Sequence, residues 1–176
     1  MIQYIIAAEH NPLWAEMYER EALEIKRILH AELVEIHHIG STSVKGLRAK
    51  PVIDIMPVVK DVSAVDIHNE EFEQLGYECM GEYGMPGRRF FRKGGDNRTH
   101  HIHIFEENNR TDILRHLAVR DYLRTHPQVA KEYGDLKAEL AEKFHDSIDG
   151  YCDGKDAVVK DMEQNALAWY GEQREV

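Results

Sequence analysis

A short stretch of the chain, residues 37–55, holds residue types whose spacing suits phosphate chemistry. Gly40 and Ser41 follow an apolar segment, and a glycine lets the backbone approach a ligand closely. The free N–H groups at the start of a following short helix can then face an anion. Asp54 lies in the apolar run 52–56, where a carboxylate is costly to bury without a metal, an arginine or another donor. A turn that can bind phosphate, followed by a carboxylate on the next strand, predicts nucleotide or phosphate-ester chemistry.

Two histidines form a second group of candidates. His101 and His103 are two residues apart in a predicted strand, so their side chains should point to the same face. Two imidazoles on one face can share a metal or flank a substrate. Because the chain holds 11 histidines, a chance pair is the alternative interpretation. We interpret the pair as site residues and expect them beside Asp54.

The other candidates also have plainer interpretations. The Gly-Ser turn is also typical of an ordinary strand-to-helix connection, and Asp54 is also typical of a structural carboxylate paired with an arginine. Lys50 lies just before the strand of Asp54 and can reach a phosphate, but a solvated loop lysine is the alternative. A basic hairpin indicates either a charged edge strand that resists pairing or a wall that faces a phosphate. Its cationic residues are Arg88, Arg89, Arg92, Lys93 and Arg98.

Composition limits the classes of protein to which the chain can belong. It has 22 Lys and Arg against 32 Asp and Glu, a net charge of −10, which argues against general binding to nucleic acid or anionic membranes. Its two cysteines, Cys79 and Cys152, have no metal-binding spacing and indicate a reducing compartment. The apolar run 2–8 is broken by Gln3 and lacks a basic start, so it resembles neither a signal peptide nor a membrane span. We therefore expect a cytoplasmic protein without membrane contact.

The order of predicted elements indicates an α+β fold. A helix starts at Asn11 and Pro12, and Ser63 is expected to cap a helix that runs to about Leu75. The predicted strands are 34–39, 52–59, 77–83, 88–93 and 100–105. The predicted C-terminal helices are 111–126, 129–144 and 153–171. We expect a mixed sheet with packed helices, a helical C-terminal third and, since no linker is visible, one domain over 1–176.

Several motifs together resemble the GrpB family, within the nucleotidyltransferase superfamily. The resemblance covers nearly the whole chain and is far more specific than a Gly-Ser turn alone. Its opening is Asn-Pro-Leu-Trp at 11–14 with Glu21 downstream. The remaining motifs are 38–44, 50–55, 98–103, 120–123, 133–137 and Tyr151 with Lys155.

The resemblance implies a nucleotidyltransferase-like sheet and a site on its strands. In this superfamily a Gly-Ser turn precedes carboxylates that hold metal ions, which implies Asp54 as a catalytic ligand of Mg²⁺. It also implies His101 and His103 as catalytic groups, either as ligands or as a base. Asp121 can pair with an arginine and orient it. The implied phosphate-binding residues are Gly40, Ser41, Thr42, Ser43, Lys50, Arg120, Lys137 and Lys155.

One departure from the superfamily pattern bears on catalysis. The pattern has two carboxylates two residues apart, and here the second position is Met56. A thioether is a poor partner for Mg²⁺, which prefers oxygen. The site is therefore expected to be weaker, or to use other ligands, and Glu82 and Glu106 are the carboxylates that could compensate.

Three functions remain compatible with these residues. The first is a nucleotidyltransferase-like protein that binds a nucleotide or related phosphate compound and transfers a nucleotidyl group to a small acceptor with Mg²⁺. The second is a non-catalytic phosphometabolite-binding module, which the Met56 departure favours. The third is an interaction domain linked to coenzyme A metabolism, because members resembling this chain also occur fused to dephospho-coenzyme A kinase.

Overall fold

The computed structural model describes residues 6–174, so most of the apolar run 2–8 lies outside the described part. Its internal contacts divide the chain into two compact units. The sheet unit comprises Leu13–Ile39 and Val52–Ile113, and the helical unit comprises Met1–Pro12, Gly40–Pro51 and Leu114–Val176. The expectation of one domain over 1–176 stays a prediction. Among the described residues, no helix combines the length and apolar character needed to cross a bilayer.

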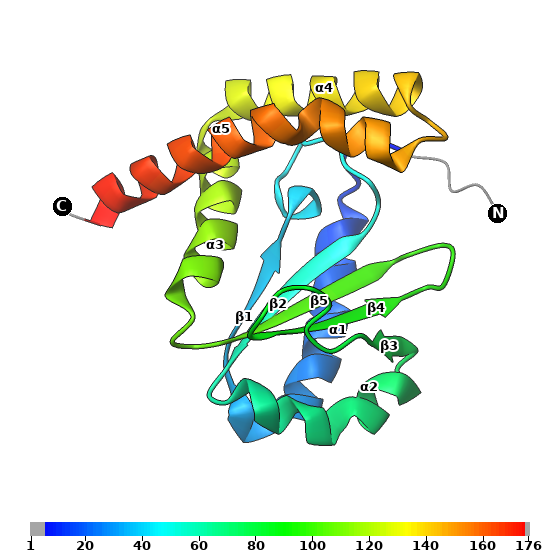
Figure 1. Ribbon diagram of the computed structural model, residues 1–176, viewed down its shortest axis with the longest axis vertical. Helices are drawn as coiled ribbons and strands as arrows, with labels where there is room; N and C mark the ends of the chain where they lie inside the picture. The colour runs from blue at the N-terminus through cyan, green and yellow to red at the C-terminus, as the bar shows by residue number, and fades with distance from the viewer. Residues whose placement is uncertain (1–5, 175–176) are drawn as a thin grey trace. The chain divides into compact units, whose positions relative to one another are not determined.

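The sheet unit contains one mixed five-stranded sheet, as predicted (Figure 1). Its strands are β1 (Leu33–Ile39), β2 (Ile53–Val59), β3 (Tyr77–Cys79), β4 (Arg88–Lys93) and β5 (His100–Glu106). They lie in the order β1-β2-β5-β4-β3. The β2–β5 pair is parallel and the other pairs are antiparallel. The strands that contain Ile36 and Ile53, β1 and β2, are antiparallel neighbours.

Strand β2 lies in the interior of the sheet, and its burial follows from its apolar sequence. Every residue of β2 is buried except Asp54, which is partly exposed. On the neighbouring β5, the alternation is equally plain, because Ile102 and Ile104 are buried whereas His101 and His103 are partly exposed. The polar side chains of these two strands are thus the ones that reach an accessible face.

The sheet unit also contains one long helix before the first strand and shorter helical segments between β2 and β3. Helix α1 (Leu13–Leu29) buries one face and packs against β1 and β2. The predicted helix from Ser63 is instead a 3₁₀ segment, η3 (Val62–His68), followed by the short α2 (Asn69–Gln74). The cap is Asp61, whose side chain accepts a hydrogen bond of 2.9 Å from the Ser63 N–H. The predicted strand 77–83 ends at Cys79.

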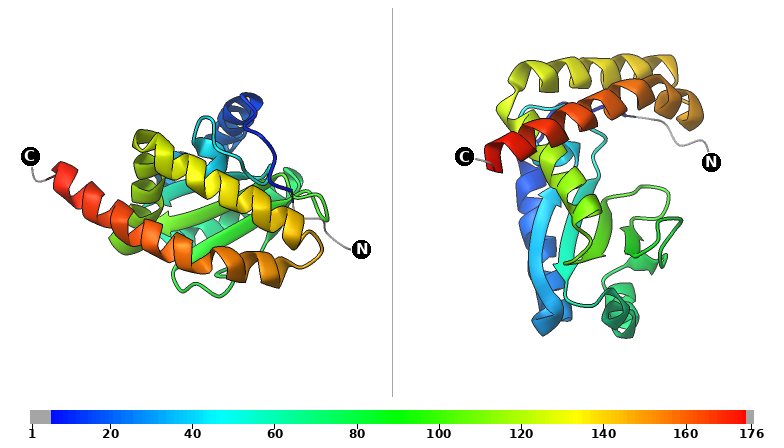
Figure 2. Two further views of the ribbon diagram at one scale, coloured as in Figure 1. Left: turned by 90° about the horizontal axis from the view of Figure 1, so that it is seen from above. Right: turned by 60° about the vertical axis from the view of Figure 1, so that its left-hand side comes forward.

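The helical unit contains most of α3 (Arg110–Thr125), α4 (Pro127–Lys143) and α5 (Ile148–Arg174). Helices α4 and α5 run antiparallel and side by side (Figures 1 and 2). The two helices lie close together at Gly154, where an added Cβ would lie 2.6 Å from a methyl carbon of Leu140 and that side chain would have to shift. The expectation of a helical C-terminal third is confirmed, although α5 begins five residues before the predicted start at 153.

Candidate functional site

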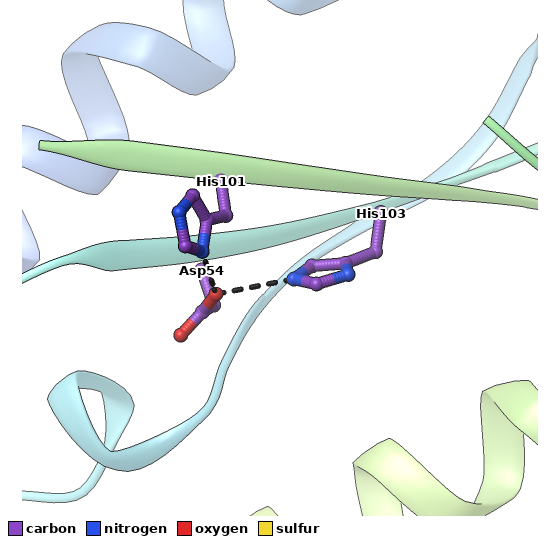
Figure 3. A group of neighbouring side chains, drawn as sticks. All are labelled: Asp54, His101 and His103. Atoms are coloured by element: carbon purple, nitrogen blue, oxygen red, sulfur yellow. Dashed lines mark hydrogen bonds and ion pairs between the residues drawn. The ribbon is translucent and has the colours of Figure 1, made fainter. Parts of the chain in front are cut away.

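Asp54, His101 and His103 meet on one face of the sheet unit (Figure 3). The parallel register places Asp54 of β2 directly beside His101 of β5, and alternation brings His103 to the same face. The Asp54 Oδ1 lies 3.1 Å from His103 Nε2 and 3.6 Å from His101 Nδ1. The expected proximity of the two histidines to Asp54 is confirmed, and their chemical roles stay predictions.

The surroundings of Asp54 favour its charged form. Burial alone would raise the pKa of this carboxyl, but hydrogen bonds from His101 and His103, together with their charges, outweigh burial and hold the pKa well below its ordinary value. The three side chains keep 27%, 26% and 15% of their surface exposed, in the order Asp54, His101, His103. The site therefore offers an ionised oxygen and two ring nitrogens to a ligand or a metal ion.

Phe90 supports both imidazoles from strand β4. The Phe90 ring centre lies 5.3 Å from that of His101 and 5.2 Å from that of His103. Tyr83 stacks on Phe90 at 5.2 Å, and the Arg88 guanidinium lies 4.8 Å from the Phe90 centre. The sequence interpretation missed Phe90 as a neighbour of the two histidines. The pairing of Phe90 with His103 in the β4–β5 register explains why Phe90 lies beside them.

No second carboxylate joins this group within the described residues. Met56, at the position where the superfamily has its second acid, is fully buried with 0% of its surface exposed. The carboxylate of Glu82 accepts a hydrogen bond of 2.6 Å from the Gly87 N–H. Glu106 accepts one of 3.1 Å from the Val62 N–H. Neither glutamate compensates for Met56, so that suggestion is wrong.

The basic hairpin is not at the edge of the sheet, and four of its cationic side chains form ion pairs with acidic side chains. Strand β4 lies between β5 and β3, so the edge-strand interpretation is wrong for its residues. Acidic side chains pair with its cations at 2.7–3.4 Å. These ion pairs are Arg89–Asp66, Arg92–Glu78, Arg98–Glu78 and Lys93–Glu21.

The Gly-Ser turn lies in the helical unit and differs from the expected helix start. Gly40 adopts φ 71°, a left-handed value that favours glycine, and residues Ser41–Ser43 form a single 3₁₀ turn, η2. Thr42 and Ser43 are buried. The Ser43 carbonyl accepts two hydrogen bonds, at 3.0 and 2.9 Å, from the Arg124 guanidinium. The short helix expected after Gly40 is therefore only a 3₁₀ turn in which Arg124 holds Ser43, and anion binding by Gly40–Ser43 stays a prediction.

Ser41 instead contacts a buried lysine. Lys137 of α4 is 3% exposed, and its Nζ donates a hydrogen bond of 2.8 Å to Ser41 Oγ. The same Nζ lies 4.6 Å from the centre of the Tyr133 ring, a favourable position for a cation. Burial and the neighbouring Tyr151 raise the pKa of Tyr133 to about 12, although a hydrogen bond with Ser41 lowers it. Ser41, Tyr133 and Lys137 thus form one polar cluster.

This cluster borders a cavity of about 170 Å³ in the helical unit. Its polar lining includes Arg115, His116, Glu163, the Gly40–Ser41 turn and Arg120, which Asp121 holds at 2.8 Å as expected. Its apolar lining is Val119, Leu123, Val159 and Met162. The sequence interpretation missed Arg115 and His116, and only His116, four residues before Arg120, could have been identified by helical spacing.

Two predicted phosphate-binding lysines do not belong to the described lining of this cavity. Lys50 is exposed. The Lys155 Nζ lies 4.6 Å from the centre of the Tyr151 ring. The cavity therefore gathers Gly40, Ser41 and Arg120 from the predicted set, with Lys137 reaching it through Ser41.

Comparison with known proteins first defines the class of fold. The chain superposes on a crystal structure of Cid1 poly(U) polymerase with a TM-score of 0.52 over 75% of this chain and 44% of that one, at 18% identity. The fold is accordingly a nucleotidyltransferase-like α+β fold. A crystal structure of the conserved protein GrpB from Enterococcus faecalis is far more similar, with a TM-score of 0.91 and 49% identity over 94% of this chain and 99% of that one.

The chain belongs to the GrpB family, whose profile, "GrpB protein", matches residues 4–165. It is 46% identical to the UPF0157 protein YqkA of Bacillus subtilis, over 91% of this chain and 46% of that protein. It is 31% identical to the glutamate-rich protein GrpB of Alkalihalophilus pseudofirmus, over 90% of this chain and 93% of that protein. The chain thus spans less than half the length of YqkA.

Proposed function

We propose that this protein binds a nucleotide or related phosphate compound through the cavity of the helical unit. The observation that carries the proposal is the hydrogen bond of 2.8 Å between the buried Lys137 ammonium and the Ser41 hydroxyl at the cavity wall. The Lys137 ammonium brings a positive charge to the Ser41 hydroxyl, and such a charge attracts an anionic ligand. Arg120 adds a planar guanidinium suited to phosphate oxygens.

The mixed lining of the cavity suggests which parts of the ligand its residues would contact. The phosphate would contact Ser41 and Arg120, and an apolar part would contact side chains such as Val119 and Val159. A volume of about 170 Å³ is below the roughly 300–1,000 Å³ of pockets that enclose drug-sized ligands. The cavity therefore suits one phosphate and part of the attached group, with the remainder of the ligand outside.

Transfer of a nucleotidyl group to a small acceptor is the reaction that the fold favours. The Cid1 structure of similar fold was solved with MgGTP bound, which supports nucleoside triphosphates as the first ligands to test. The catalytic roles that the family resemblance implies for Asp54, His101 and His103 stay predictions, and the transfer reaction is proposed on the fold likeness alone.

A non-catalytic phosphometabolite-binding module is the second candidate. The buried Met56 favours it, because a fully buried thioether at this position offers no oxygen to neutralise charge at a reacting phosphorus. The association with dephospho-coenzyme A kinase stays a prediction from the family resemblance.

A ligand panel read by thermal unfolding tests the proposal. The panel contains the common nucleoside mono- and triphosphates, dephospho-coenzyme A, coenzyme A and inorganic phosphate, each with and without divalent cations. A ligand at 100 times its Kd stabilises the folded state by about 2.7 kcal/mol, which is readily measured. We expect a phosphate compound with an organic group to stabilise the protein more than inorganic phosphate does. No stabilisation by any of these compounds would contradict the proposal.

Release of pyrophosphate separates the two candidate functions. A nucleoside triphosphate that binds and yields pyrophosphate with a small acceptor supports transfer. Binding of that triphosphate without pyrophosphate release, across a panel of acceptors, supports the binding module.

A further inference from the structure

The residues around Asp54 do not fit the Mg²⁺ centre that the fold class implies. Mg²⁺ prefers a nearly complete shell of oxygen ligands, whereas this group provides one carboxylate and two imidazoles. The second carboxylate of a two-metal centre is absent, since Met56 occupies its position and is fully buried. Imidazole nitrogens instead favour first-row transition metals.

We propose that Asp54, His101 and His103 bind a single first-row transition-metal ion, such as Zn²⁺, in preference to Mg²⁺. All three donor atoms lie within 4.8 Å of one another. Two imidazoles and one carboxylate on one face form a donor set that leaves other coordination positions open. A metal in this arrangement can still bind water or an oxygen of a ligand.

The separations between the donor atoms fit such an ion. Metal–ligand bonds of roughly 2.0–2.2 Å place neighbouring ligands about 3.0 Å apart in an octahedral site and about 3.4 Å apart in a tetrahedral site. The distances from Asp54 Oδ1 are 3.1 Å to His103 Nε2 and 3.6 Å to His101 Nδ1. Two of the three separations therefore match such a site, and the third, between the two imidazole nitrogens, is at most 4.8 Å.

The donors are positioned by paired strands and by an aromatic ring. Asp54 and His101 lie opposite each other in the parallel β2–β5 ladder. Phe90 lies beside both imidazole rings, at centre distances of 5.3 and 5.2 Å. The apolar surroundings of a metal site control its access to solvent, so this ring is expected to affect metal affinity.

This inference does not depend on the proposed phosphate site. Its three residues belong to the sheet unit, and the cavity residues belong to the helical unit. A metal can bind without any phosphate compound, and a phosphate compound can bind without the metal. The two proposals can therefore fail separately.

Isothermal titration of the metal-free full chain tests the inference. Zn²⁺, Co²⁺, Mn²⁺ and Mg²⁺ are titrated separately in a buffer that does not chelate metals. We expect one Zn²⁺ per chain, affinities that fall from Zn²⁺ through Co²⁺ to Mn²⁺, and Mg²⁺ binding at least about 100-fold weaker than Zn²⁺. Binding of Mg²⁺ as tight as that of Zn²⁺, or no Zn²⁺ binding, would overturn the inference.

Variants separate this site from adventitious binding to the other histidines. Asp54→Asn and the double variant His101→Gln with His103→Gln should abolish the tight Zn²⁺ site. The control is His68→Gln, because His68 also pairs with a carboxylate, Glu71, at 2.8 Å but lies elsewhere in the sheet unit. Unchanged Zn²⁺ affinity in the folded double variant, or loss in His68→Gln alone, would refute the assignment.

A spectrum of the wild-type protein keeps the inference testable if those variants fail to fold. Nitrogen-15 NMR of the histidines with and without Zn²⁺ reports which ring atom binds the ion. The geometry predicts coordination through Nδ1 of His101 and Nε2 of His103. Zn²⁺-dependent shifts confined to other histidines would contradict it.

Discussion

The Lys137 Nζ donates a hydrogen bond of 2.8 Å to the Ser41 Oγ, across 96 positions of the chain. This bond joins helix α4 to the 3₁₀ turn that follows Gly40. The positive charge at the Gly-Ser turn is thus the Lys137 ammonium, whereas the sequence suggested the N–H groups of a helix N-terminus. Phosphate recognition at this turn would therefore rely on side-chain charge more than on backbone N–H groups.

Replacing Asp54 by Asn should change how stability depends on pH. Because the pKa of Asp54 is lowered from its ordinary value of 3.8, the folded state gains stability from this group above that pH and loses it as the pH falls further. The wild type should therefore be more stable than Asp54→Asn at pH 6, and the difference should shrink between about pH 4 and pH 2. Urea unfolding at several pH values measures it. A difference that is constant with pH would contradict the lowered pKa.

Met56→Asp should destabilise the protein. Met56 is fully buried, so the new carboxylate would lose its hydration without a partner, at a cost expected to exceed about 3 kcal/mol. The matched control Met56→Leu should cost less than about 1.5 kcal/mol, because it conserves volume and polarity. Urea unfolding compares the two. A stable Met56→Asp variant that gains Mg²⁺ affinity would instead indicate a degraded two-metal centre.

Phe90→Leu should weaken Zn²⁺ binding, by less than the roughly 10–100-fold that loss of a hydrogen-bonded partner of a metal ligand costs, because both imidazoles lose the ring packed beside them. Phe91→Leu is the control, since Phe91 is also buried on β4 but contacts Phe72, at a ring distance of 4.5 Å, and not the two histidines. Both variants remove a buried ring, so both should lower stability. Titration of Zn²⁺ into the two folded variants should separate them, and equal losses of affinity would refute the role of Phe90.

Two glycines of α5 should respond to alanine in opposite directions. Gly154→Ala places a Cβ 2.6 Å from Leu140 and should destabilise the protein by about 1–3 kcal/mol. Gly171→Ala meets nothing within 4 Å and should stabilise α5 by roughly 0.5–1 kcal/mol. The unfolding free energies of the two variants measure this. Destabilisation of equal size in both would contradict the close packing of α4 and α5.

The sheet and its polar face could be predicted largely from local alternation. Apolar runs identified β2 and β5, and a spacing of two placed His101 and His103 on one face. The full burial of Met56 depends on neighbouring elements, so local spacing did not reveal it, whereas the Asp61 cap is a local contact with Ser63 that the sequence interpretation missed. As with Met56, the helix expected after Gly40 failed because of neighbouring elements, since η2 is a short turn whose Ser43 is held by Arg124.

The cavity residues were harder to predict than the sheet. Only the family resemblance pointed to Lys137, because no local pattern connects a helical lysine with a serine 96 positions away. His116 lies four residues before Arg120, so it shares a helical face with Arg120 and could have been found by periodicity. Lys50 and Lys155 belong to family motifs but not to the described lining of the cavity, so their expected role stays a prediction.

A calorimetric titration of Lys137→Met with the strongest ligand of the phosphate panel tests whether a phosphate compound binds beside Lys137 in the cavity of the helical unit. Methionine keeps a buried apolar stem, and replacing a buried charge in this way is often tolerated by the fold. The control is Lys155→Met, because the Lys155 Nζ lies at the same 4.6 Å from a tyrosine ring as the Lys137 Nζ does. We expect at least about a tenfold loss of affinity, about 1.4 kcal/mol, in Lys137→Met and wild-type affinity in Lys155→Met. Wild-type affinity in a folded Lys137→Met variant would refute phosphate binding beside Lys137.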